Sequence, residues 1–190
     1  MEIQENVIGE FLPFDHERYK MHFDIVPREI LQNYQKCWLT SDYSASYLTH
    51  SKIFNKNFIN SVSFIISEIL QNAVKYSYNC DSRISMTIFE NKNLLIIEIS
   101  NFISEAQKEL FHKLLEKLIF CTDIENEYIE ALIRVSENIK QPVVTGIGIV
   151  TILHDFHPGV SAKFIGPDDN HRYETVVQVC VNQEEYKNEN

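Results

Sequence analysis

Several features are scarce in this 190-residue chain. It has five glycines, five prolines and four cysteines. No apolar run reaches the roughly 18 residues that a membrane-spanning helix needs, and the N-terminal sequence MEIQENVIGE lacks the basic-then-apolar pattern of a secretory signal. We therefore expect a cytoplasmic protein without a membrane partner.

Positive charge is scarce as well. The chain carries 17 Lys and Arg against 27 Asp and Glu, which gives a formal net charge of -10. Such a balance argues against a protein whose main role is to coat nucleic acid, because phosphate backbones are bound chiefly through Lys and Arg. A nucleotide would have to be held by local features and by magnesium.

The four cysteines are far apart, and none forms a C-x-x-C pair (Cys37, Cys80, Cys121 and Cys180). We expect them to be small hydrophobic residues in a reducing compartment, with neither a disulfide nor zinc. His154 and His157 have a spacing that would allow a metal ion to bind between them. Asp155 is their only neighbouring carboxylate, which favours a structural role.

The order of the periodic segments predicts one α/β domain of residues 1–190. We expect a two-layer sandwich, with a mixed and mostly antiparallel sheet and with helices on one face. The expected strands are 7–12, 20–26, 83–90, 94–101, 161–165 and 173–181, and the expected helices are 28–51, 56–77, 104–120, 124–138 and 149–156. Residues 182–190 read as a flexible tail.

The most informative segment is residues 68–76, which read EILQNAVKY near the end of a long apolar-periodic helix. Helical spacing places Glu68, Asn72 and Lys75 on one face. A carboxylate can act as a base, an amide oxygen can ligate a hard cation, and an ammonium can meet phosphate charge. The alternative is an ordinary solvated helix face, on which these residue types are common.

This segment resembles the N-box, E-x-x-x-N-A-x-K-Y/H, of the GHKL superfamily of ATP-binding proteins. The resemblance implies the Bergerat fold and continues downstream in the same order. Asn101 stands at the family's adenine-binding aspartate and Ile103 at its glycine, a departure from the usual Asp-x-Gly. Gly146 and Gly148 match the glycine box before a helix, and Thr175 matches the threonine of the last strand.

A closer likeness is to the SiaB-type protein kinases, relatives of the anti-sigma-factor serine/threonine kinases. The corresponding strings here are EILQNAVKYS, EISN and TGIGIVTILHDF. An asparagine at the position of Asn101 is typical of that group. The resemblance covers residues 55–181, which would carry the nucleotide-binding boxes, while residues 1–54 would add two strands and an aromatic helix.

The resemblance implies an ATP- and Mg²⁺-dependent serine/threonine kinase in a partner-switching system. Glu68 would be the catalytic base and Asn72 the magnesium ligand. Lys75, Asn101, Gly146, Gly148 and Thr175 would join Asn72 in holding ATP. The substrate would be a small antagonist protein, like an anti-anti-sigma factor, and a downstream target would compete for the same surface. The alternatives are a catalytically silent binding module and an ATP-hydrolysing switch.

Aromatic residues recur along the predicted helix of residues 28–51, at Tyr34, Trp38, Tyr43 and Tyr47. By analogy with anti-sigma-factor kinases, they could form a homodimer interface. They could equally belong to the core, and the sequence alone leaves both possibilities open.

Overall fold

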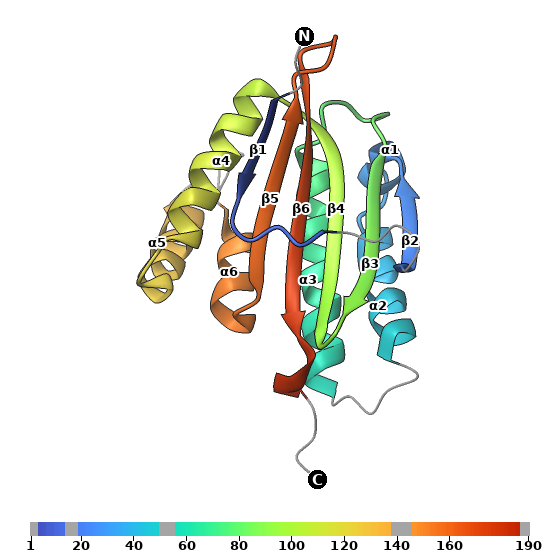
Figure 1. Cartoon of the computed structure of the whole chain (residues 1–190), viewed down its shortest axis with the longest axis vertical. Helices are drawn as coiled ribbons and strands as arrows, with labels where there is room; N and C mark the ends of the chain where they lie inside the picture. The colour runs from blue at the N-terminus through green and yellow to red at the C-terminus, as the bar shows by residue number, and fades with distance from the viewer. Residues whose placement is uncertain (1–3, 14–18, 50–55, 138–145, 187–190) are drawn as a thin grey trace.

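The computed structural model describes residues 4–13, 19–49, 56–137 and 146–186. Its elements, in chain order, are β1 Gln4–Ile8, β2 Tyr19–Ile25, α1 Pro27–Leu31, α2 Gln35–Thr49, α3 Lys56–Lys75, β3 Ile84–Asn91, β4 Leu94–Ser104, α4 Glu105–Ile119, α5 Ile124–Glu137, α6 Ile147–Phe156, β5 Gly159–Gly166, β6 Arg172–Asn182 and the 3₁₀ helix η1 Gln183–Tyr186. The strands form one sheet in the order β1-β5-β6-β4-β3-β2 (Figure 1).

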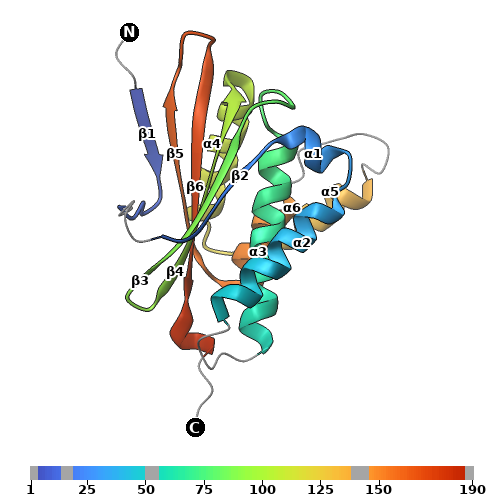
Figure 2. The ribbon, with the colours of Figure 1, turned by 90° about the vertical axis from the view of Figure 1, so that its right-hand side faces the viewer.

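The helices lie together on one face of this sheet (Figure 2). The predicted α/β class and one-sided arrangement are therefore confirmed. The sheet was expected to be mixed, but all its described strand pairs are antiparallel. None of the described helices is both long enough and apolar enough to cross a membrane.

Helix α3 supplies much of the core between the sheet and the other helices. The apolar stripe predicted from its sequence is buried, with each member less than 9% exposed: Phe58, Val62, Ile65, Ile66, Ile69 and Ala73, together with Leu70 and Val74. Burying one large aliphatic or aromatic side chain contributes about 1.5–3 kcal/mol. Burial of this stripe therefore determines which face of α3, the one with Glu68, Asn72 and Lys75, points away from the core.

The first two strands lie at opposite edges of the sheet. β1 pairs with β5, whereas β2 pairs with β3, and residues 9–13, which follow β1, cross the outer sheet face (Figure 1). The buried Gln178 holds this crossing: its Nε2 donates to the Leu12 carbonyl at 2.9 Å and to Glu98 at 2.8 Å, and its Oε1 accepts from the Leu12 N–H at 3.0 Å. Residues 14–18, between the two expected strands, lie outside the described residues.

The prediction of a single helix over residues 28–51 was wrong, because the helix is interrupted between α1 and α2. Pro27 begins α1, one residue before the expected helix start. The Asn33 side chain then accepts a hydrogen bond from the Gln35 N–H at 3.0 Å. A local side-chain bond of this kind competes with continued helix and favours a new helix start.

The flexible tail predicted for residues 182–190 was wrong in its described part. Asn182 ends β6, and η1 follows it directly. The Tyr186 ring packs on Phe58 with centroids 5.1 Å apart, and Gln183 is buried. Tyr186, the last described residue, therefore packs against the start of α3.

All four cysteines are free, as expected. Cys37 is fully buried, whereas Cys80, Cys121 and Cys180 are partly exposed. Burial raises the pKa of Cys37 to about 11 and that of Cys180 to about 11. Both are therefore thiols at neutral pH and poor nucleophiles.

We predict that Gln178→Ala lowers the free energy of unfolding by about 1–3 kcal/mol, because it leaves the main chain of Leu12 and the Glu98 carboxylate without their buried partner. Urea titration followed by circular dichroism measures the loss. Gln35→Ala, at an exposed glutamine, is the matched control and should stay within about 0.5 kcal/mol of the original protein. Equal losses for both variants would contradict the role of the Gln178 side chain.

Candidate functional site

A pocket opens between the helical layer and the sheet, with walls from α3, α4, α6, β4 and β6. The structure brings all seven residues singled out in the sequence to its lining, although they are spread over more than 100 positions of the chain. These are Glu68, Asn72, Lys75, Asn101, Gly146, Gly148 and Thr175.

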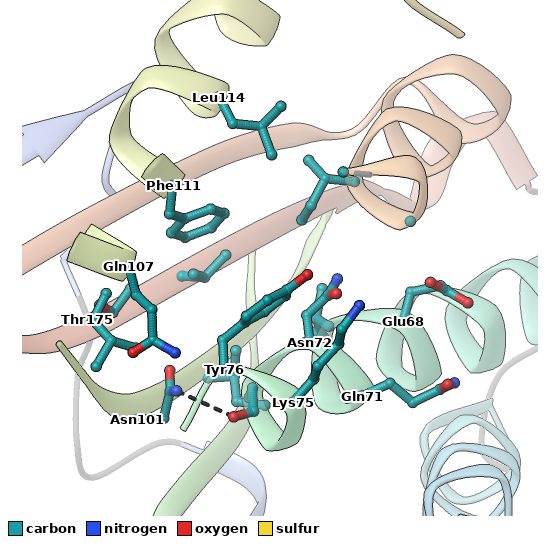
Figure 3. Close-up of a pocket in the computed structure, with 18 of the residues that line it drawn as sticks. Glu68, Gln71, Asn72, Lys75, Tyr76, Asn101, Gln107, Phe111, Leu114 and Thr175 are labelled. Carbon is teal, nitrogen blue, oxygen red and sulfur yellow. Dashed lines mark hydrogen bonds between the residues drawn. The ribbon is translucent and has the colours of Figure 1, made fainter. Parts of the chain in front are cut away.

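The polar ridge of α3 forms one side of this pocket (Figure 3). Lys75 is exposed, with its Nζ 5.1 Å from the Tyr76 ring centroid, and it forms no salt bridge with a described carboxylate. The half-buried Glu68 carboxylate has no hydrogen-bond partner among the described residues, and burial raises its pKa above the ordinary value. A carboxyl group with a raised pKa is better suited to accept a proton near neutral pH.

Helix α6 meets this ridge end-on. It begins at Ile147, so Gly148 lies inside its first turn. The predicted start at residue 149 was therefore wrong by two residues. A Cβ atom at Gly148 would collide with Glu68 Oε2 and would lie 3.4 Å from Asn72 Nδ2. The missing side chain therefore lets α6 approach the two predicted catalytic and metal-binding residues.

The N-terminus of α6 is open toward the pocket. Gly146 is the N-cap residue, with a left-handed φ of 63° and no side-chain capping bond. A Cβ at this position would lie 3.0 Å from Leu114 of α4. Uncapped N–H groups and the helix dipole favour an anion there. The remainder of the expected glycine loop, residues 141–145, lies outside the described residues.

The far end of the pocket holds Asn101 and Thr175, which are directly opposite each other in the β4–β6 register. Asn101 Nδ2 donates to the Ala73 carbonyl at 3.2 Å, which turns its Oδ1 toward the pocket (Figure 3). The Thr175 hydroxyl is buried and has no partner among the described residues. Such unpaired polar groups are costly and call for an explanation. A ligand that forms hydrogen bonds with both Asn101 and Thr175 would give the Thr175 hydroxyl its missing partner.

The strand end predicted at residue 101 was wrong. β4 continues to Ser104, and Ile103 is buried within it opposite Tyr173. Ile103, which the resemblance aligned with a glycine, is therefore an ordinary strand residue. Asn101 projects from the middle of a continuous strand pair, which fixes its side chain more firmly than a strand end would.

Sequence reasoning missed the α4 wall and two aromatic residues of the pocket. Phe111 and Leu114 close it from above, and Tyr76 points into it (Figure 3); Tyr34 also contributes to the lining. Gln107 forms a capping box with Ser104 through its Oε1, so its amide nitrogen is left to donate. The Ser-x-x-Gln spacing is a recognisable helix-start signal, but it does not tell which side of the sheet the helix covers.

His154 is one of the two histidines whose spacing would allow a metal ion to bind, and its ring instead contacts two carboxylates and a tyrosine. His154 of α6 contacts Glu125 of α5 and Asp155, each at 2.6 Å, and its ring stacks on Tyr128 at 4.3 Å between centroids. Both hydrogen bonds raise the pKa of His154, and the bond to Asp155 has the larger effect. The described part of the chain contains no group of three or more His, Cys, Asp or Glu residues arranged to hold a metal.

No protein-family model and no curated protein matches this chain.

We predict that Thr175→Val leaves the free energy of unfolding unchanged or raises it by up to about 1 kcal/mol, because it removes a buried hydroxyl without a partner. Thr87→Val, in β3 of the same sheet, is the matched control: its hydroxyl is 2.9 Å from His22 Nδ1, and its loss should cost about 1 kcal/mol. Chemical denaturation compares the two. Equal destabilisation would mean that Thr175 is already satisfied inside the protein.

We also predict a pH-dependent contribution from His154. Because its pKa is raised by folding, the associated stability is fully present below the unfolded pKa of about 6.5 and is lost as pH rises through the folded pKa. His154→Gln should therefore lower the melting temperature more at about pH 5.5 than at about pH 8.5. His171→Asn, at an exposed site with positive φ, serves as the control. A pH-independent difference would contradict the prediction.

Proposed function

We propose that this protein is an ATP- and Mg²⁺-dependent serine/threonine protein kinase with a Bergerat-type fold, acting on a small antagonist protein in a partner-switching system. The observation that carries the proposal is the division of the pocket into two ends. Asn101 and the unpartnered Thr175 hydroxyl mark a base-binding end. Glu68, Asn72, Lys75 and the open N-terminus of α6 mark a phosphate end.

The base-binding end fits an adenine edge by its hydrogen-bonding pattern. Asn101 Oδ1 is left to accept from an exocyclic amino group, because its Nδ2 is held by Ala73. Thr175 can donate to a ring nitrogen, and the Gln107 amide nitrogen lies on the same side (Figure 3). Apolar side chains from the sheet and α4 cover the ring faces, namely Ile99, Ile103, Phe111 and Val177.

The phosphate end fits a magnesium triphosphate by its charge and its donors. Asn72 would supply an oxygen ligand to Mg²⁺, which neutralises phosphate charge when bound. Lys75 adds a cation from the rim, and the N–H groups of Ile147 and Gly148 face the phosphates from α6. These local features offset the repulsion between the nucleotide phosphates and a chain with a net charge of -10.

In the proposed reaction, Glu68 accepts the proton of a serine or threonine hydroxyl on the partner protein. The hydroxyl oxygen forms a bond to the γ-phosphorus while the bond from that phosphorus to the β–γ bridging oxygen breaks, and ADP leaves. Lys75 and the first turn of α6 stabilise the charge on the transferring group. Partial burial suits Glu68 to this role, since it raises the carboxyl pKa.

We predict that ATP with Mg²⁺ raises the melting temperature by about 5–10 °C at a concentration about 100-fold above Kd. Asn72→Ala should lose the Mg²⁺-dependent part of this shift, and Thr175→Val should bind ATP more weakly despite its intact stability. Differential scanning fluorimetry with and without Mg²⁺ measures both. Without any shift at millimolar ATP, the silent binding module becomes the better account.

We predict further that Glu68→Gln keeps the ATP-induced shift but lowers phosphoryl transfer about 10²–10⁴-fold, because the general base is removed while the shape is kept. Partner proteins captured with the full chain are incubated with labelled ATP to measure transfer. Glu109→Gln, on the exposed side of α4, should transfer normally. Undiminished transfer by Glu68→Gln would exclude the mechanism, and ATP hydrolysis without protein labelling would favour the switch.

A further inference from the structure

The side-chain amide of Gln107 is held in one orientation at the base-binding end of the pocket. Gln107 lies in the first turn of α4, and its Oε1 accepts hydrogen bonds from the Ser104 N–H and the Ser104 hydroxyl, each at 2.9 Å. A backbone N–H can only donate, so the amide atom that faces it is the oxygen. The nitrogen Nε2 is therefore on the opposite side of the amide, where Figure 3 shows it turned toward Asn101.

This nitrogen is available to a ligand. Gln107 is half-buried and belongs to the lining of the pocket. Its Nε2 carries two hydrogens and has no hydrogen-bond partner among the described residues. A shielded donor without a partner costs free energy, which a ligand with an acceptor at this place recovers.

The start of helix α4 does not require an amide at position 107. A capping box is closed equally well by Glu or Gln, because only a side-chain oxygen takes part in it. Glu would even interact more favourably with the N-terminal end of the helix dipole. What Gln107 adds to the capping box is a neutral side chain with a donor that faces the pocket.

Three polar groups of this end match the edge of adenine. Asn101 Oδ1 is an acceptor, because Nδ2 donates to the Ala73 carbonyl, while the unpaired Thr175 hydroxyl and Gln107 Nε2 are donors. In adenine the exocyclic amino group lies between two ring nitrogens that accept, N1 and N7. Guanine has the acceptor O6 in place of the amino group, so it would set one acceptor against Asn101 Oδ1.

We propose that Gln107 is a specificity-determining residue, whose amide nitrogen donates to one of the two ring nitrogens beside the adenine amino group. Gln107 lies outside the collinear segments on which the family resemblance depends. The inference rests on the proposed function, because it requires a nucleotide base at this end of the pocket. It adds a third base contact, from α4, to those of Asn101 and Thr175 in the sheet.

The test uses the full chain with Mg²⁺ and four ligands: ATP, 1-deaza-ATP, 7-deaza-ATP and inorganic tripolyphosphate. Isothermal titration calorimetry measures each Kd. Gln107→Glu keeps the capping box but replaces the donor with a carboxylate oxygen, so it should weaken ATP binding about 5–150-fold. Tripolyphosphate binding should stay within about 3-fold, because the ribose separates the base from the terminal phosphates by more than the screening length of about 8 Å.

The two deaza analogues identify the contact directly, because each lacks one ring nitrogen. The analogue without the nitrogen that Gln107 contacts should bind the original chain about 5–150-fold more weakly than ATP does. In Gln107→Glu this loss should disappear, whereas the loss for the other analogue should remain. Such non-additivity is expected only for groups in contact.

Gln71→Glu is the matched control, since it makes the same chemical change on α3, where Gln71 lines the pocket beside Lys75 and donates to the Ser67 hydroxyl at 2.9 Å. Its added charge should weaken ATP and tripolyphosphate by the same factor. If circular dichroism shows that Gln107→Glu is unfolded, Gln107→Met replaces it, because Met has similar length and no donor.

Two failures can be told apart. If the original chain binds ATP, but Gln107→Glu keeps the original ratio of ATP to tripolyphosphate affinity, the role of Gln107 is overturned and the proposed function stands. Equal binding of ATP and both deaza analogues by the original chain overturns it as well. If the original chain binds neither ATP nor tripolyphosphate, the proposed function and the role of Gln107 are both wrong.

Discussion

The packing of α3 on the sheet is the contact on which the rest of the molecule depends. Its apolar stripe is buried almost completely, and a helix has no freedom to rotate once such a stripe is fixed against strands. The direction of Glu68, Asn72 and Lys75 is therefore a consequence of core packing. The same helix carries α2 on its other side and meets the first turn of α6, so it supports both the pocket and the outer helix.

Much of this arrangement could be read from local sequence patterns. The period of apolar residues placed α3, and the strands expected at residues 83–90 and 94–101 form the β3–β4 hairpin, in whose turn Lys92 has a positive φ. The collinear segments predicted which seven residues would meet. These inferences succeed because helix periodicity and tight turns are determined by residues close together in the chain.

The inferences that failed depend on contacts between distant segments. Nothing near β1 and β2 tells that they pair with strands at opposite edges of the sheet. The aromatic residues of α2 were ambiguous because both faces of this helix carry apolar residues, and only its position outside α3 shows which face is free. Gln107 and Phe111 enter the pocket because α4 folds back over β4 and β6, a matter of topology that local spacing does not encode.

The asparagine at position 101 gains its meaning from the same topology. An ionised aspartate there could not donate to the Ala73 carbonyl, and its charge would face the oxygen of that peptide. The amide can bond to α3 with its nitrogen and still present its oxygen to the pocket. The departure from Asp is thus compatible with recognition of an amino group and adds a link between the two layers. Because Thr175 stands opposite with an unpaired hydroxyl, the strand pair offers an acceptor and a donor side by side. This is the hydrogen-bonding complement of an adenine edge.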